Sequence, residues 1–374
     1  MSSTARLGRH ASETPVLRSL ALPEPNEDPT PQGQPYENRT GPLPGVTIAL
    51  PVLNEAAHIE GCLRAVVAQT YPRIVEILVL DGGSTDDTRQ IAAAFPGVRV
   101  LDNPGRRQSA GLNLALHEAR GDVLVRVDGR TVVAPDYVDR CVAALTDSGA
   151  ALVGGPIDPD GTSWVERCVG AALTSKLGAG PARFRNTEAS ADWTDIVYLG
   201  AARVEDLRRL GGYDEEFSTN EDGELLYRLS RQGGVWFDPT IRSTYRPRGS
   251  FATFLRQYFF YGIGRAATVR KYPASLRPRQ LAAPLLVLGL ISPWRRQVAL
   301  LYLAVIVAGA APEVRQDPAA AAGLAVALPV MHLSWGAGFL VGFLRSFRHW
   351  RNSNNESNSN NESNRRTTRR PGSP

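Results

Sequence analysis

The chain has 374 residues, of which 43% are hydrophobic and 21% charged, and it carries a formal charge of +5. Its three cysteines lie far apart and its five histidines do not cluster, which argues against a disulfide framework, a structural zinc site or a histidine-based metal centre. The positive charge favours an anionic partner such as nucleotide phosphates or a membrane surface, and no basic-aromatic or finger module indicates nucleic acid.

Residues 1–44 are rich in Pro, Ser, Glu and Gly and contain no apolar segment of signal-peptide length. We therefore expect a disordered segment rather than a signal peptide. Residues 46–50 then predict a strand that ends at Pro51. Asn54 is a typical N-cap for the helix that follows, whose apolar positions fall on one face.

An uninterrupted apolar run, Ile77–Leu80, predicts a strand buried on both faces, as in a parallel sheet. It ends at Asp81, and two glycines and the helix-capping residues Ser84–Asp86 follow. A carboxylate at the carboxyl end of such a strand lies where open α/β sheets bind ligands. The alternative is a tight turn capped by Asp81 and Ser84.

Further strands are predicted at 98–101, 123–127 and 151–155, alternating with helices at 108–119 and 135–146. This alternation predicts βαβ units and a mostly parallel sheet. After residue 156 the pattern loosens into a helix, a strand, two helices, a strand and a long helix, at 164–177, 196–201, 204–210, 221–231, 235–237 and 251–271. We expect one α/β domain over residues 45–272, in which Asn220 caps the helix that begins at Glu221.

Three apolar runs follow, at 281–291, 298–312 and 319–344, and they predict a membrane region over residues 280–346. Arginines and lysine precede and follow this region, so the positive-inside rule places both flanks in the cytoplasm and requires an even number of spans. We expect two spans, 298–312 and 319–344, with 281–291 in the membrane interface. The alternative for the last run is a buried hairpin in a soluble core. Residues 347–374 repeat Ser-Asn-Asn-Glu-Ser-Asn and are expected to be disordered.

Acidic residues occur at strand ends and at one helix start: Glu55, Asp81 and Asp128 follow strands, and Glu221 and Asp222 open a helix. A parallel sheet brings the first three to one edge. No histidine or cysteine nucleophile accompanies them. Carboxylates can bind a base or ribose, hold a hard cation such as Mg²⁺ on phosphates, or take a proton. Together they indicate chemistry on a nucleotide diphosphate.

In this order, the segments Pro51–Glu55, Asp81–Asp86, Arg126–Gly129 and Asn220–Asp222 resemble the motifs of family 2 glycosyltransferases, which have the GT-A fold. A closer similarity is to the membrane-anchored branch that builds exopolysaccharide, including succinoglycan-type glucosyltransferases. Gly105–Gln108 with Asn113, Arg126–Asp128, Gln257–Arg265 and the apolar runs carry that closer similarity.

The resemblance implies a nucleotide-sugar pocket made by Pro51, Asn54, Glu55, Asp81, Gly82, Ser84, Arg107, Gln108, Arg126 and Asp128. Asp128 would hold Mg²⁺ or Mn²⁺, and Asp222 would be the base, supported by Glu221. Gln257 and Arg265 would lie near the diphosphate or the acceptor, although the Gln-x-x-Arg-Trp motif of many relatives is absent. Arg126 occupies the first position of the usual Asp-x-Asp, and it cannot bind a cation but can pair with a phosphate or orient Asp128. Asp222 can equally be a carboxylate stabilised by its helix dipole.

These expectations predict a membrane-bound inverting glycosyltransferase in the cell membrane with a cytoplasmic catalytic domain. It would transfer single sugars from UDP-glucose or a similar donor to a lipid-linked or polysaccharide acceptor. A nucleotidyltransferase is disfavoured, because Pro51–Glu55 replaces the expected glycine-rich, basic phosphate signature. A non-catalytic membrane scaffold that binds a nucleotide sugar or a glycan is the remaining alternative. The sequence does not indicate an oligomeric state.

Overall fold

The computed structural model describes residues 42–180, 182–314 and 322–345. Most of the N-terminal segment 1–44, the whole of 347–374 and residues 319–321 of the last apolar run lie outside the described residues. The predictions for these parts are therefore not addressed by the structure.

The core of the fold is an eight-stranded sheet with the order β3-β2-β1-β4-β9-β6-β10-β8. Strands β3, β2, β1 and β4 are mutually parallel, and β10 is parallel to β6. The sheet is mixed because β9 runs antiparallel to both β4 and β6, and β8 runs antiparallel to β10. These strands span Val46–Val52 (β1), Ile74–Asp81 (β2), Val98–Asp102 (β3), Val123–Arg126 (β4), Leu152–Gly155 (β6), Asp192–Thr194 (β8), Tyr198–Arg203 (β9) and Val235–Phe237 (β10). The predicted mixed, mostly parallel sheet is confirmed.

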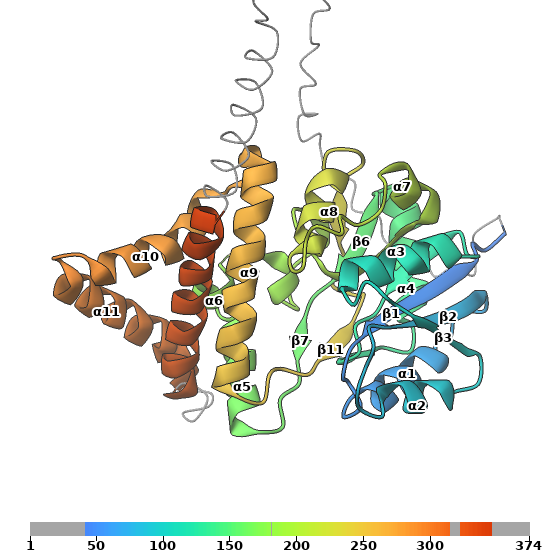
Figure 1. The fold of residues 1–374 in the computed structure, drawn as a ribbon, viewed down its shortest axis with the longest axis horizontal. Helices are drawn as coiled ribbons and strands as arrows, with labels where there is room; N and C mark the ends of the chain where they lie inside the picture. The colour runs from blue at the N-terminus through green and yellow to red at the C-terminus, as the bar shows by residue number, and fades with distance from the viewer. Residues whose placement is uncertain (1–41, 181, 315–321, 346–374) are drawn as a thin grey trace, which may run out of the picture.

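Helices cover both faces of this sheet (Figure 1). Alternation along β1 assigns the faces: Ile48 and Leu50 pack into one buried cluster, and Ala49 packs into the other. The first cluster includes residues of α1, α2 and α4, and the second includes residues of α3, α7 and α8. These helices span Ile59–Val67 (α1), Thr88–Ala93 (α2), Gln108–Glu118 (α3), Tyr137–Ser148 (α4), Val204–Arg209 (α7) and Glu221–Leu229 (α8). Two-sided burial accounts for the continuous apolar runs in the parallel strands.

A long helix, α9 (Phe251–Lys271), stands between the sheet domain and a group of apolar helices (Figure 1). α9 packs with α5 (Trp164–Thr174), α11 (Arg295–Val314) and the C-terminal helix Ala322–Arg345 in a third buried cluster. α6 (Lys176–Ala179) and α10 (Ala282–Ile291) complete the group, with 3₁₀ turns at Arg183–Arg185, Pro273–Ser275 and Pro278–Leu281.

Of the helices in the described part of the chain, Ala322–Arg345 is the one long and apolar enough to cross a membrane, by length and composition alone. Pro278–Ile291 is apolar but shorter. The expected spans at 298–312 and 319–344 thus fall within α11 and largely within the C-terminal helix. Their number and their placement in a membrane stay predictions.

Several local predictions were wrong. β1 continues through Pro51 to Val52, because β4 pairs with β1 only as far as Ala49 and a residue without an N–H is tolerated beyond that point. The predicted helix 164–177 breaks at Ser175, which has an extended backbone and whose side-chain oxygen caps the short α6 by accepting the N–H of Gly178. The sequence also gave no signal for the small sheet β5-β11-β7, whose strands span only Thr131–Val133, Ser243–Tyr245 and Asp158–Pro159.

Candidate active site

A cavity of about 1120 Å³ begins at the carboxyl edge of β1 and β4 and extends to the apolar helices beside α9. It brings together most of the residues that the sequence predicts for the site. Those that line it are Pro51, Glu55, Gly82, Arg107, Gln108, Arg126, Asp128, Glu221, Asp222, Gln257 and Arg265. Asn54, Asp81 and Ser84 are not among its lining residues.

Asn54 and Ser84 instead join the two loops that follow β1 and β2. The backbone N–H of Asn54 donates to Ser84 Oγ at 3.0 Å, and Asn54 Oδ1 accepts from the backbone N–H of Thr85 at 2.8 Å. Asn54 has a φ of 54°, a left-handed conformation that Asn tolerates better than most residues. The prediction that Asn54 caps the following helix is wrong, because α1 begins five residues later, at Ile59.

Asp81 is buried at the end of β2, where its Oδ1 accepts the backbone N–H of Ser84 at 3.0 Å. Its Oδ2 lies 3.5 Å from Arg89 Nη1. These contacts fit the alternative expectation that Asp81 organises a turn. A carboxylate that stabilises a turn can also contact a nucleotide, so the role of Asp81 in nucleotide recognition stays a prediction.

Arg126 links the carboxylates of two distant segments at the centre of the site. Its Nε donates to Asp128 Oδ1 at 2.9 Å, its Nη2 lies 3.3 Å from Asp128 Oδ2, and the same Nη2 lies 3.6 Å from Glu221 Oε1. Gln108 Nε2 donates to Asp128 Oδ1 at 3.0 Å. Burial favours the neutral form of Arg126, but Asp128 and Glu221 outweigh it and hold the pKa of Arg126 well above its usual value. The guanidinium is thus a fixed positive charge on the cavity wall.

Glu55 faces the same cavity and pairs with Arg130, whose Nε lies 2.9 Å from Glu55 Oε2. Burial raises the pKa of Glu55 more than Arg130 lowers it. Glu55 follows β1 and Arg130 follows β4, and these strands are parallel neighbours. The ion pair therefore links the two loops at the carboxyl edge of the sheet.

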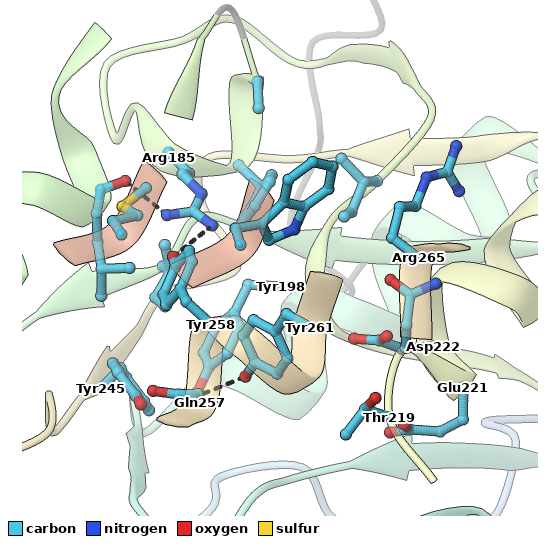
Figure 2. A pocket seen from close by; sticks show the side chains of 18 of the residues that line it. Arg185, Tyr198, Thr219, Glu221, Asp222, Tyr245, Gln257, Tyr258, Tyr261 and Arg265 are labelled. Atoms are coloured by element: carbon cyan, nitrogen blue, oxygen red, sulfur yellow. Dashed lines mark hydrogen bonds between the residues drawn. The ribbon is translucent and has the colours of Figure 1, made fainter. Parts of the chain in front are cut away.

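Glu221 and Asp222 begin α8, but their environments differ. Glu221 is 5% exposed, and burial, followed by the charge of Asp222, raises the pKa of Glu221 to about 7. Asp222 is exposed and lines the cavity near Tyr261 (Figure 2). Glu221 thus lies toward Arg126, and Asp222 is left open to a ligand.

Asn220 precedes this pair with a φ of 64° and makes no side-chain cap, contrary to the expected capping role. Gln257 Nε2 donates to the Tyr261 hydroxyl at 2.8 Å, which joins one predicted residue to a tyrosine that the sequence did not single out. Sequence reasoning also missed cavity-lining residues from both sheets and from the helical segments, namely Arg130, Arg185, Tyr198, Tyr213, Tyr245, Arg248 and Arg279. Tyr245 lies on the three-residue β11, whose partner β5 is distant in sequence, so local pattern did not indicate it.

Within the described residues no group of three or more His, Cys, Asp or Glu side chains could hold a metal ion by itself. The residues nevertheless fit an ion carried by phosphates, because Mg²⁺ is commonly held by one or two carboxylates, substrate oxygens and water. Asp128 Oδ2 is the candidate ligand, since its one hydrogen bond, from Arg126 Nη2 at 3.3 Å, is long.

An open mixed α/β sheet with carboxylates at its carboxyl edge is an arrangement found in the GT-A class of glycosyltransferase folds. The mannosyltransferase PcManGT from Pyrobaculum calidifontis, solved with GDP-Man and Mn²⁺, has a similar fold: its TM-score is 0.51 and its identity 23%, over 80% of this chain and 87% of that one. Residues 47–174 match the profile of glycosyl transferase family 2, and residues 123–333 match that of glycosyl transferase family group 2.

The succinoglycan biosynthesis protein ExoA of Rhizobium meliloti is 36% identical over 307 residues, which cover 78% of this chain and 93% of that protein. The dolichyl N-acetyl-alpha-D-glucosaminyl phosphate 3-beta-D-2,3-diacetamido-2,3-dideoxy-beta-D-glucuronosyltransferase of Methanococcus voltae is 24% identical over 60% of this chain and 74% of that protein. The chain belongs to glycosyltransferase family 2, and the fold and family that the sequence predicts are confirmed.

Proposed function

We propose that this glycosyltransferase transfers one sugar, with inversion, from UDP-glucose or a similar nucleotide-diphosphate sugar to a lipid-linked or polysaccharide acceptor. The product would be an exopolysaccharide or another cell-envelope glycan. One observation carries the proposal: the exposed carboxylate of Asp222 and the donor-side residues around Arg126 and Asp128 line one continuous cavity. The similarity to the succinoglycan biosynthesis protein ExoA supports an exopolysaccharide as the product.

In the proposed reaction, the acceptor oxygen attacks the anomeric carbon, and the bond from that carbon to the nucleotide diphosphate breaks on the opposite face. Asp222 takes the proton of the acceptor hydroxyl, an effect worth roughly 10²–10⁴ in rate. Arg126 and Arg107, which line the donor side of the cavity, stabilise the negative charge of the leaving diphosphate. Glu221 and Asp128 keep Arg126 oriented.

Asp128 would hold a divalent cation, Mg²⁺ or Mn²⁺, together with the donor phosphates. When bound, such an ion neutralises part of the charge that develops on the leaving diphosphate. The Mn²⁺ in the similar mannosyltransferase fold supports this assignment. We expect EDTA to lower turnover, and MnCl₂ or MgCl₂ to restore it in the wild type but not in Asp128→Asn.

The apolar helices would attach the enzyme to the cell membrane, with the catalytic domain on the cytoplasmic side, where nucleotide sugars are made. Large side chains on α10 and α11 are exposed, among them Leu285 at 61%, Ile291 at 77% and Leu300 at 68%. Exposed apolar surface of this extent is typical of a membrane-contacting face. Fractionation of cells, with washing in salt and in carbonate, would test this placement.

The decisive experiment gives purified enzyme a panel of nucleotide sugars and an extract of cell-envelope lipids, and measures released nucleoside diphosphate and product mass. We expect release with one donor, and a loss of about 10²–10⁴ in kcat for Asp222→Asn with unchanged UDP binding. Unchanged turnover in Asp222→Asn would remove the proposed base. The second candidate, a scaffold that binds a nucleotide sugar without transfer, is favoured by Arg126 at the usual acidic position, and it predicts donor binding without any release.

A further inference from the structure

The cavity carries more positive charge than a donor diphosphate alone accounts for. Eight arginines line it, against four carboxylates. Two of these arginines, Arg126 and Arg130, pair with carboxylates of the site, and both come from the donor side. A second basic group comes from α9 and the segments packed around it; its members are Arg185, Arg248, Arg265 and Arg279. In the described part of the chain, none of these four makes an ion pair within 4.0 Å.

Arg265 is a partly buried member of this group, and its partners leave its charge uncompensated. Its guanidinium donates to Gln280 Oε1, at 3.2 Å from Nε and 3.0 Å from Nη2, and to the carbonyl of Ser275. Burial, with smaller contributions from Arg277 and Arg279, lowers the pKa of Arg265 to about 10. A partly desolvated cation without an acidic partner is costly, so this place favours an anionic ligand.

Arg265 is also tied to the helix that carries the proposed base. The preceding residue, Gly264, lies so close to the loop before α8 that a Cβ on it would be 2.4 Å from the carbonyl oxygen of Thr219. Thr219 is three residues before Asp222, and Figure 2 draws Asp222 and Arg265 on the same side of the cavity. An anion at Arg265 would therefore lie on the acceptor side of the proposed base.

Beyond these arginines the cavity wall becomes apolar. Arg279 is followed by the cavity-lining residues Ala282, Ala283 and Leu286 of α10, and the wall continues with Val298 and Leu301 of α11. Leu301 is also 69% exposed, so the cavity opens to the apolar outer surface between these helices. The cavity therefore has arginines at one end and, at the other, an apolar groove that opens to the surface between α10 and α11. Such a shape suits an amphiphile with an anionic head group.

We propose that Arg265 and Arg279 bind the phosphate of a lipid-linked acceptor, whose hydrocarbon chain lies along α10 and α11. The inference rests on the proposed transferase function and deepens it, because it selects a lipid phosphate over a polysaccharide as the acceptor. The phosphate occupies a site separate from the donor diphosphate, which binds at Arg107 and Arg126.

Calorimetric titration of the full-length enzyme in detergent tests this with four probes: geranylgeranyl phosphate, geranylgeraniol, inorganic phosphate and UDP. We expect the lipid phosphate to bind at least about tenfold more tightly than the alcohol or the free ion, because both halves of the site contribute. Arg265→Gln and Arg279→Gln each remove most of this advantage and leave UDP binding unchanged. Arg277→Gln is the matched control, because Arg277 pairs with Asp195 at 2.9 Å and does not line the cavity.

The proposal is overturned if the lipid phosphate and the alcohol bind equally, or if Arg265→Gln and Arg279→Gln weaken UDP binding instead. If loss of the Ser275 contact unfolds Arg265→Gln, Arg279→Gln decides the outcome, since its side chain is exposed. Failure of the transferase proposal is distinguishable: the probes then bind as expected, but no donor yields nucleoside diphosphate. Transfer to a lipid-phosphate acceptor at full rate and with an unchanged KM in both variants would leave the transferase intact and remove the phosphate site.

Discussion

Asn220 Nδ2 donates a hydrogen bond of 2.7 Å to Thr268 Oγ1 and so fixes the start of α8 to the last turn of α9. Thr219 adds a second link, because its hydroxyl donates to the carbonyl of Phe260 at 2.9 Å. Glu221 and Asp222 follow Asn220 directly and begin α8. The helix that stands against the apolar helices therefore also positions the proposed base.

Gly264→Ala should reduce kcat on the order of 10²-fold, because the new methyl would lie 2.4 Å from the Thr219 carbonyl and displace Asp222 by a fraction of an ångström to an ångström. The KM for the donor should change little. Steady-state kinetics measure both. Gly61→Ala on α1 is the control, since a Cβ there meets nothing within 4 Å.

Thr268→Val gives a milder version of the same test, because it keeps the volume of the side chain and removes the acceptor for Asn220. We expect a smaller loss of kcat with a native thermal unfolding profile. If both α9 variants retain wild-type kcat, α9 does not position Asp222.

Glu221 should make stability fall as pH rises from about 4.5 to about 7. Its pKa is raised in the folded protein from 4.5 to about 7, so within this window the folded state holds a proton that the unfolded state has lost. Its contribution is therefore fully present below pH 4.5 and is lost as pH rises through 7, by up to about 3 kcal/mol at about 1.4 kcal/mol per pKa unit.

The measurement compares thermal unfolding of the wild type and Glu221→Gln between pH 4.5 and 8. We expect the wild type to lose stability relative to the variant with increasing pH. A constant difference between the two proteins over this range would contradict the raised pKa of Glu221.

Arg126→Gln should destabilise the protein by about 3 kcal/mol, because it leaves the buried Glu221 and the partly buried Asp128 without their cation. Chemical denaturation of the solubilised enzyme gives the free energy of unfolding. The control is Arg64→Gln, which breaks an exposed ion pair with Glu60 and should change stability by less than about 1 kcal/mol. Equal effects of the two substitutions would show that Arg126 does not organise the site.

Asn54→Ala should lower stability by roughly 1–2 kcal/mol, because Ala is strained at a φ of 54° and cannot accept the N–H of Thr85. It should also raise the KM for the donor, since Glu55 follows directly. Asn54→Gly separates the two causes: it relieves the backbone strain but still lacks the acceptor. An Asn54→Ala enzyme with wild-type stability and KM would mean that the two loops hold their positions without this contact.

Much of the architecture follows from local pattern. Apolar runs such as Ile77–Leu80 predicted the parallel strands, and the acids that follow them predicted the edge where the site lies, because side chains at equivalent ends of parallel strands meet. The order of the motifs predicted the family. The short strands β5, β7 and β11 were not predicted, because they pair with one another across more than 80 residues of sequence.

The sequence by itself therefore determined which residues could carry chemistry and at which sheet edge they would gather. The tertiary structure decided what each of them contacts. It brought Arg126 next to Glu221, which is 95 positions later in the chain. It also showed that Asn54, the expected helix cap, instead links two loops through a hydrogen bond. It also placed Arg265 and Arg279 beside the apolar groove between α10 and α11. These relationships arise from packing between segments far apart in the chain, and periodicity, capping preference and composition report only on near neighbours.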